Sequence, residues 1–305
     1  MMQNSKKYLI VVCGPTAVGK TSVGIRLARH FNTEVVSADS RQFFAEMSIG
    51  TAKPIDAELD LIKHHFIGHI SIEQDYNAGK YEADALLKLS ELFATKQTVI
   101  LVGGSGLYIN ALCNGMDEIP ETTASIRNLL NAKYKSEGLQ PLLAQLESLD
   151  KAYFDEVDHS NHIRIIRALE VCLSTGIPFS SFRKKQKKKR DFEIIKIGLT
   201  LKRELLYERI NERVNQMLKL GLEDEVKALH SKKELNALQT VGYSELFDYF
   251  DRQISFEQAV DLIKQHTRNF AKRQMTWFNK DTDIQWFEPS EIDDIIHFIY
   301  SKTAI

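Results

Sequence analysis

An octapeptide near the N-terminus, GPTAVGKT at 14–21, has the residue types and spacing of a phosphate-binding loop, or P-loop. Gly14 and Gly19 would let backbone N–H groups turn inward around phosphate oxygens, and the helix that follows would add its N-terminal partial charge. Lys20 supplies a full positive charge, and the hydroxyl of Thr21 suits phosphate or Mg²⁺. The motif, which is common in nucleotide-binding and ATP-binding proteins, predicts a polyphosphate ligand without specifying a nucleoside triphosphate.

The acidic residue expected of a P-loop ATPase is not where such an enzyme needs it. An ATPase would place a Mg²⁺-binding Asp after an apolar strand, but the segment TVILVGGSG at 98–106 ends in glycines. The segment EVVSAD at 34–39 ends instead in Asp39. Because ligands bind at the carboxyl ends of parallel strands, Asp39 is a candidate metal ligand or general base. The plainer alternative is a loop aspartate that caps a turn.

Short apolar segments that alternate with helical patterns would position these groups. Segments with the pattern of buried strands occur at 8–13, 34–39 and 98–104, with a further candidate at 64–71. Helical patterns lie between them at 20–31 and 81–94. This alternation predicts a parallel sheet that is covered by helices.

The pattern changes after residue 115. Apolar residues have helical spacing from 122 to 176, and a strand pattern returns at 192–201. From 203 the chain is mostly helical, and Ser255 with Gln258 predicts a capping box that opens a helix to about 279.

We therefore predict an α/β fold with a P-loop, parallel-sheet core that has helices on both faces, a helical insertion and a helical C-terminal region. The core and C-terminal region would comprise 1–115 and 191–305, and the insertion would comprise 116–190.

Composition is that of a globular protein, with 43% hydrophobic and 27% charged residues among 305. Cys13, Cys113 and Cys172 form no C-x-x-C pair, so we expect buried reduced thiols rather than a disulfide framework or a zinc finger. No apolar run approaches the ~18 residues that span a membrane. The expectation is a cytoplasmic enzyme that does not enter a membrane.

Eight short motifs, taken in order, carry a resemblance to a known family. They are GPTAVGKT (14–21), DSRQ (39–42), MSIGTAKP (47–54), VGGSGLY (102–108), RIIRALEV (164–171), STGIP (174–178), VGY (241–243) and TRNFAKRQMTWF (267–278). The chain resembles the tRNA dimethylallyltransferases, also called tRNA isopentenyltransferases, over nearly its whole length. Without the Cys-rich finger of the eukaryotic members, it is similar to the bacterial form.

The resemblance implies transfer of a dimethylallyl group from dimethylallyl diphosphate to N6 of an adenosine beside the tRNA anticodon. In such a protein the P-loop holds the diphosphate of the prenyl donor, with Mg²⁺ near Thr21, which explains why no Asp follows 98–102. Asp39 would be the general base. Ser105 replaces the usual Thr and would assist as a hydroxyl. The residues implied to bind the diphosphate are Gly14, Pro15, Thr16, Ala17, Val18, Gly19, Lys20, Thr21, Arg209 and Arg213.

The same resemblance implies a set of tRNA-binding residues, among which the amide of Gln42 could pair with the adenine edge. The set is Asp39, Ser40, Arg41, Gln42, Ser105, Arg127, Ile163, Arg164, Ile165, Ile166, Arg167, Gln239, Thr240, Val241, Gly242, Tyr243, Ser244, Thr267, Arg268, Asn269, Phe270, Ala271, Lys272, Arg273 and Gln274. Three sites depart from the family pattern. Phe43-Phe44 lacks a usual Tyr, Ser244 stands where a basic residue is common, and Gly68 replaces an Asp.

Several features admit a structural explanation as well as a functional one. The basic run RKKQKKKR at 183–190 could bind RNA backbone or be a solvated loop. For His64-His65 we expect a core or hydrogen-bonded pair rather than a metal site, because no further ligand lies at a suitable spacing. For Phe270, Trp277 and Phe278 we expect core packing rather than base stacking.

The net charge of −1 hides a strong polarity along the chain. Residues 117–160 carry nine acidic and four basic residues, whereas 161–213 carry fourteen basic and six acidic. Residues 262–280 carry five basic residues and no acidic one. The basic stretches include most of the implied tRNA contacts, so a polarised surface could steer tRNA although the total is nearly neutral.

Two other functions fit parts of the sequence. A P-loop nucleotide kinase, or an enzyme that prenylates free adenine nucleotides, would also use 14–21. A non-catalytic RNA-binding protein would have no need of an intact Gly19-Lys20-Thr21 together with Asp39. Basic segments and RIIRALEV favour tRNA. A monomer suffices for the chemistry.

Overall fold

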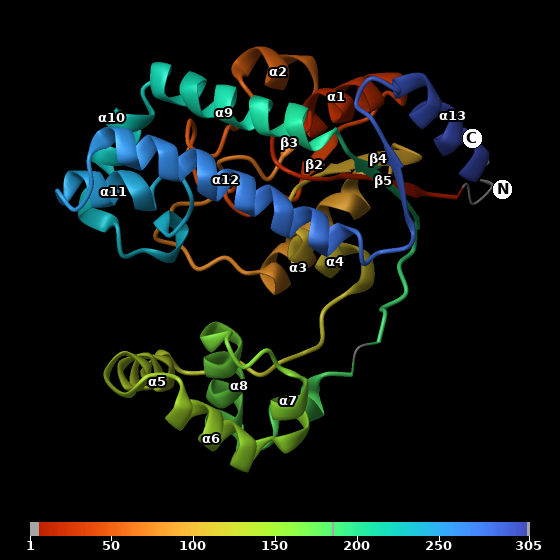
Figure 1. Ribbon diagram of the computed structural model, residues 1–305. Helices are drawn as coiled ribbons and strands as arrows, with labels where there is room; N and C mark the ends of the chain where they lie inside the picture. The colour runs from red at the N-terminus through yellow and green to blue at the C-terminus, as the bar shows by residue number, and fades with distance from the viewer. Residues whose placement is uncertain (1–5, 185, 304–305) are drawn as a thin grey trace. The chain divides into compact units, whose positions relative to one another are not determined.

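The computed structural model describes residues 6–184 and 186–303. The chain divides into two compact units (Figure 1), of which one comprises the residues up to Cys113 and from Lys189 on, and the other comprises Asn114–Lys188. The second unit differs by two residues at each end from the predicted insertion at 116–190. Outside the described residues lie 1–5, 185 and 304–305. All of them belong to the predicted domains, and residue 185 also belongs to the basic run at 183–190.

The first unit is built on a parallel sheet whose described part has six strands in the order β3-β2-β4-β1-β5-β6. Every neighbouring pair is parallel. The central strands are long apolar runs because helices cover both of their faces. The strands are β1 (Tyr8–Cys13), β2 (Val35–Ser37), β3 (His64–His65), β4 (Thr98–Val102), β5 (Glu193–Leu199) and β6 (Ile284–Phe287).

Two strands differ from the sequence prediction. The segment 64–71 forms a strand only at its first two residues, because Phe66 and Gly68 have φ angles of 64° and 59°, which no strand can continue through. The strand β6 was not expected, since 203 onward was predicted to be mostly helical. Its four residues at a sheet edge are too few to give a clear alternating pattern.

Helices cover both faces of the sheet, as predicted. One apolar cluster joins the sheet to α1 (Lys20–His30), α9 (Arg203–Lys219) and α13 (Ile292–Lys302). A second cluster on the other face joins it to α3 (Ala78–Leu92), α4 (Gly106–Asn114) and the end of α12 (Phe256–Phe278). The carboxyl ends of the strands are thereby left for the loops that follow them.

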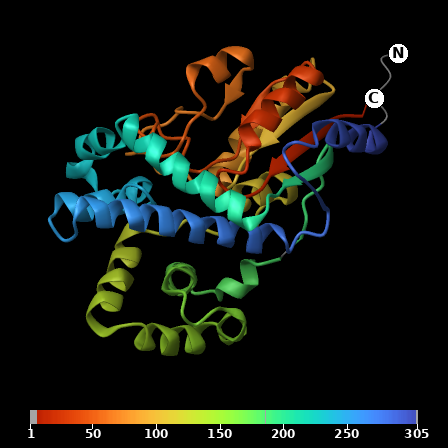
Figure 2. The ribbon, with the colours of Figure 1, turned by 45° about the horizontal axis from the view of Figure 1, so that its top comes forward.

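The C-terminal helical region adds a third cluster in the same unit. It contains buried residues of α10 (Leu222–Ala228), α11 (Ser244–Phe250) and α12, together with Phe44 and Met47. Helix α12 begins at the predicted capping box, in which Ser255 Oγ accepts from Gln258 N at 3.2 Å and Gln258 Oε1 accepts from Ser255 N at 2.8 Å. Figures 1 and 2 both show α9 and α12 running side by side.

The second unit consists of helices, as its spacing predicted, and has no strand among its described residues. Helices α5 (Ala124–Glu137), α6 (Gln140–Leu149), α7 (Lys151–Glu156) and α8 (His162–Thr175) enclose a core of their own. A short helix in the first unit, α2 (Asp56–Leu61), completes the main elements. Among the described helices, none combines the length and apolarity that a membrane crossing needs.

Candidate active site

The loop 14–21 connects β1 to α1 with the geometry that its glycines predict. Gly14 has a φ of 140°, and a Cβ on it would lie 2.6 Å from the carbonyl oxygen of Leu199 on the neighbouring strand, so only glycine fits. Ala17 and Gly19 also have positive φ. The side chain of Lys20 folds back over the loop, and its Nζ donates to Pro15 O at 2.7 Å.

Three cations converge on this loop. Burial lowers the pKa of Lys20 to about 8, an effect that the nearby Asp39 opposes and Arg213 reinforces. From α9, Arg213 Nη1 donates to Thr16 Oγ1 at 3.4 Å and Arg209 Nη1 to Val18 O at 3.4 Å. The structure thus places both arginines against the predicted diphosphate loop, because residues 209 and 213 share one face of a helix that crosses the loop.

A cavity of about 810 Å³ opens beside the loop, within the first unit. It brings together Thr16, Asp39, Ser105 and Arg213, which lie on four separate segments. Most of the residues expected to bind tRNA in this unit also border it, namely Asp39, Ser40, Arg41, Ser105, Gln239, Thr240, Val241, Gly242, Ser244, Thr267, Asn269, Phe270, Arg273 and Gln274. The candidate base therefore shares one hollow with two of the candidate diphosphate-binding residues, Thr16 and Arg213.

A second hollow, of about 40 Å³, lies behind Asp39. It is bordered by Lys20, Thr21, Ser37, Asp39 and Gln42 among others, so Asp39 faces both hollows. The described residues contain no cluster of three or more His, Cys, Asp or Glu side chains that could hold a metal. A cation here would depend on the oxygens of Thr21 and Asp39 and on its anionic substrate.

The turn that carries Asp39 is held by the loop after β4. Ser105 Oγ accepts from Ser40 N at 2.9 Å and donates to Ser40 Oγ at 3.1 Å, while Asp39 Oδ1 accepts from Arg41 N at 3.1 Å. These bonds fix the carboxylate and the hydroxyl next to each other at the carboxyl ends of β2 and β4.

Gln274 has a different place from the one expected of a tRNA contact. The side chain is buried, and its Oε1 accepts from Thr16 N at 2.8 Å while its Nε2 donates to Gly104 O at 2.9 Å. It therefore clamps the loop 14–21 to the loop after β4. Because Thr16 N donates to Gln274, it is not part of the phosphate cradle predicted for 14–21.

Four other residues of the expected tRNA set have buried side chains. Ile165 and Ile166 belong to the core of the second unit, Ala271 lies in a core of the first unit, and Tyr243 is fully enclosed. This corrects the prediction for the side chains of these four residues, because each packs into an apolar core and only its backbone could meet tRNA. Val18 is likewise buried, so it can offer a ligand only its backbone.

Arg41 and Gln42 are committed to the protein itself. The guanidinium of Arg41 donates to the carbonyl oxygens of Asn236 and Ala237, both at 3.0 Å. Gln42 Nε2 donates to Thr51 O at 3.2 Å and Ala52 O at 3.0 Å. Gln42 keeps only its amide oxygen for a substrate, so the expected two-sided pairing with an adenine edge is not available in this arrangement.

In the second unit, the arginines that we expect to bind tRNA differ in how many bonds they form within the protein. Arg127 forms two bonds with the buried Glu170, at 2.6 and 2.9 Å, and Arg167 Nη1 donates to Thr122 Oγ1 at 2.9 Å and approaches Glu170 at 3.5 Å. Arg164 is exposed on α8 next to Ile163, which is 69% exposed. Ile163 and Arg164 are thus exposed, and the Arg127 side chain, although bonded to Glu170, is also 54% exposed.

The aromatic residues of α12 match the prediction of core packing only in part. Phe278 is buried as expected, but Phe270 and Trp277 are 40% and 42% exposed and border the cavity. Of the remaining expected contacts on α12, Lys272 is exposed, and Arg268 Nη1 donates to Asn211 Oδ1 at 2.7 Å.

The basic run 183–190 is not uniform in the part that the structure describes. Arg190 Nε donates to Leu112 O at 2.9 Å, and its Nη2 bonds with Glu82 Oε1 at 2.8 Å in a largely buried ion pair. Arg183 bonds with Glu156 at 3.1 Å. These two residues anchor the chain, whereas Lys184 and residues 186–189 are exposed.

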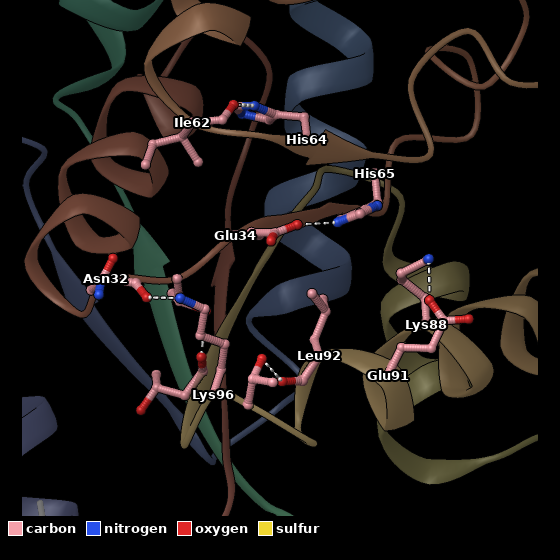
Figure 3. Close-up of polar contacts among 12 residues, drawn as sticks. Asn32, Glu34, Ile62, His64, His65, Lys88, Glu91, Leu92 and Lys96 are labelled. Carbon is pink, nitrogen blue, oxygen red and sulfur yellow. Dashed lines mark hydrogen bonds and ion pairs between the residues drawn. The ribbon is translucent and has the colours of Figure 1, made fainter.

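The histidine pair and the cysteines follow the predictions. His64 Nδ1 donates to Ile62 O at 2.7 Å, and His65 Nε2 lies 2.6 Å from Glu34 Oε2 (Figure 3). Burial lowers the pKa of His64, which favours the neutral ring. Cys13, Cys113 and Cys172 are free and buried.

Two acidic residues near the cavity were missed by sequence reasoning. Glu225 on α10 accepts backbone bonds from the segment 48–50, and Glu245 on α11 accepts from Gly242 N at 2.8 Å and pairs with His266 at 2.6 Å. His266 borders the cavity. The segment 48–50 lies in the motif MSIGTAKP at 47–54, one of the eight that carry the family resemblance. No local pattern connects that motif to residue 225.

The sheet, the Gly-rich loop between β1 and α1, and the cations that converge on that loop define an α/β protein of the P-loop class. The chain matches the IPP transferase family model over residues 42–281. It therefore belongs to the IPP transferase family of enzymes, as its eight motifs predicted.

Similar proteins agree with this assignment. A tRNA dimethylallyltransferase of Christiangramia forsetii is 51% identical over 97% of this chain and 98% of its own length. A tRNA isopentenylpyrophosphate transferase structure from Bacillus halodurans has a TM-score of 0.72 with 35% identity and covers 97% of both chains. The structure of a eukaryotic dimethylallyltransferase acting on tRNA has a TM-score of 0.79 with 25% identity, over 94% of this chain and 75% of that one.

Proposed function

We propose that the protein transfers a dimethylallyl group from dimethylallyl diphosphate to N6 of the adenosine adjacent to the anticodon in tRNA, releasing diphosphate. The observation that carries this proposal is the cavity in which Asp39 and Ser105 meet Arg213 and Thr16 of the loop 14–21, together with the small hollow that Asp39 shares with Lys20 and Thr21. The tRNA dimethylallyltransferases that are similar over nearly the whole chain support it.

The loop and its cations would stabilise the leaving group. When the C1–O bond of the donor breaks, negative charge develops on the diphosphate, and donors already aimed at it lower the barrier. We assign this role to Lys20, to N–H groups of the loop and to the two arginines, of which Arg213 contacts Thr16 and Arg209 contacts Val18.

The residues around the small hollow fit Mg²⁺, because the hydroxyl of Thr21 is a hard oxygen donor and the carboxylate of Asp39 adds a negative charge nearby. Thr21 would hold the ion beside the diphosphate. When bound, the ion would neutralise part of the charge on the leaving diphosphate.

Asp39 would act on the acceptor. An adenine N6 amine is a weak nucleophile, because its lone pair is delocalised into the ring. A carboxylate that accepts a hydrogen bond from N6 raises its reactivity and then takes the proton. Ser105, which Ser40 holds beside Asp39, would orient the same amine or the diphosphate.

The target base must leave its stack to reach this cavity. Phe270 and Trp277 border the opening and offer exposed rings, on which RNA bases stack. Lys272 and Arg273 on α12, and Ile163 and Arg164 on the second unit, would contact the tRNA. One chain holds every group that the reaction uses, so we propose that a monomer acts on tRNA in the cytoplasm.

Labelled transfer tests the proposal directly. The protein is incubated with Mg²⁺ and labelled dimethylallyl diphosphate, together with either tRNA or AMP. We expect label in tRNA and none in AMP. Label in AMP alone would favour an enzyme of free nucleotides, and turnover of ATP without any transfer would favour a kinase.

A further inference from the structure

The carboxylate of Glu225 on α10 accepts hydrogen bonds from three consecutive backbone N–H groups. Its Oε2 accepts from Ser48 N at 2.9 Å and from Ile49 N at 2.8 Å, and its Oε1 accepts from Gly50 N at 2.9 Å. The hydroxyl of Tyr243 donates to the same Oε1 at 2.6 Å. One carboxylate thus joins three segments that lie far apart in the sequence.

Tyr243 closes this arrangement from the other side. A Cβ on Gly50 would lie 2.5 Å from the Tyr243 ring, so the close approach requires glycine at this position. Burial, and then the adjacent Glu225, raise the pKa of Tyr243, so its hydroxyl stays protonated and remains a donor. The loop 48–52 is therefore bound along its N–H side by the half-buried Glu225, and Tyr243, which is fully enclosed, holds that carboxylate.

The carbonyl side of the same loop faces the candidate active site. Gly50 and Thr51 border the cavity. Ala52 O accepts from Arg213 Nη2 at 3.5 Å and from Gln42 Nε2 at 3.0 Å. The opposite nitrogen of Arg213 reaches Thr16 in the loop 14–21.

We propose that Glu225 is a positioning residue, which fixes the loop 48–52 so that Ala52 O orients the Arg213 guanidinium toward the diphosphate. A guanidinium has five donors in a fixed plane, so an acceptor on one edge determines where the other edge points. This inference rests on the proposed function in one respect, namely that Arg213 binds the diphosphate.

Glu225→Gln is the sharpest change, because it keeps the shape and removes one acceptor. An amide must turn its NH₂ group either toward Ser48 N and Ile49 N or toward Gly50 N. In both orientations a donor faces a donor, and the loop must move away. Tyr243→Phe removes a single donor and leaves the three backbone bonds, so its effect should be smaller.

The experiment measures binding of inorganic diphosphate with Mg²⁺ to the full-length protein by calorimetry. We expect Glu225→Gln to weaken binding about tenfold, the size of one charge-assisted hydrogen bond. In an Arg213→Ala background the same change should weaken binding less than about twofold, because coupled residues are not additive.

Glu46→Gln is the matched control. Glu46 also holds a loop, by accepting from Ser71 Oγ at 2.6 Å and from Ile72 N at 3.1 Å, but neither of these two residues borders the cavity. Its variant should bind diphosphate as the unchanged protein does. If Glu225→Gln also binds diphosphate normally, or loses equal affinity with and without Arg213, the positioning role is overturned.

The transfer assay separates this inference from the proposed function. A protein that binds diphosphate and shows the coupling, but transfers no dimethylallyl group to tRNA, would contradict the proposed function. The role of Glu225 in diphosphate binding would stand in that case.

Discussion

At the scale of single residues, the site depends on groups whose charge is tuned by their neighbours. Lys20 lies between the opposing influences of Asp39 and Arg213, and Asp39 itself faces both the large cavity and the small hollow. Substitutions of Asp39 and Lys20 can therefore test the transfer step and diphosphate binding separately.

Asp39→Ala should leave tRNA affinity nearly unchanged, because the many other contacts proposed for the tRNA remain. Turnover should fall by ~10²–10⁴, the usual contribution of a general base. Single-turnover transfer and a tRNA binding assay measure the two quantities separately. Unchanged turnover would remove Asp39 as the base.

The charge of Lys20 should make diphosphate binding depend on pH. Its pKa of about 8 means that the amine loses its proton as the pH rises above 8, so the attraction for an anion then decreases. The quantity to follow is the ratio of the diphosphate affinity of the unchanged protein to that of Lys20→Met. This ratio should fall by up to about tenfold per pH unit above 8 and should be constant below 7. A flat ratio across pH 7 to 9.5 would show that this charge does not titrate there.

At the scale of elements, α12 does more than present basic residues. Its buried Gln274 bridges the loop 14–21 and the loop after β4, and Trp277 contacts the first residue of α4 so closely that residue 106 must be glycine. The helix therefore fixes the two loops that flank the candidate base.

Gln274→Leu should destabilise the fold and the site together. Leucine fills a similar volume but leaves Thr16 N and Gly104 O without their partner, at a cost of about 2 to 4 kcal/mol in the free energy of unfolding. Chemical denaturation measures this cost, and calorimetry should find weaker diphosphate binding. Denaturation at the unchanged midpoint would mean that water replaces the clamp.

At the scale of the whole molecule, the second unit has a core of its own and closes on itself. Lys188 N donates to Asn114 O at 2.8 Å, so the two ends of this unit lie next to each other. A short linker can therefore replace it without stretching the first unit.

Replacing 114–188 by a short Gly-Ser linker should leave the first unit folded, with nearly normal diphosphate binding. Affinity for tRNA should fall by more than about tenfold, because the exposed Arg127 and Arg164 are lost with the unit and each phosphate contact adds to binding. Circular dichroism, diphosphate calorimetry and a tRNA shift assay measure the three properties. Full tRNA affinity would exclude the second unit from recognition.

The sequence by itself determined what local rules control. Glycine spacing in 14–21, the apolar runs of β1 and β4, the helical spacing of 122–176 and the capping box at Ser255 all depend on residues a few positions apart, and the structure agrees with each. It also identified the family from eight short motifs in order.

Only the tertiary structure decided which of the expected residues face a ligand. Helical spacing says that Ile166 and Arg167 point in different directions, but not which of them meets the core. Gln274 with Thr16, and Glu225 with Gly50, bond across 258 and 175 positions. Such pairs follow from how the helices pack on the sheet, and no local pattern records them, because a hydrogen bond depends on distance in space and not on separation along the chain.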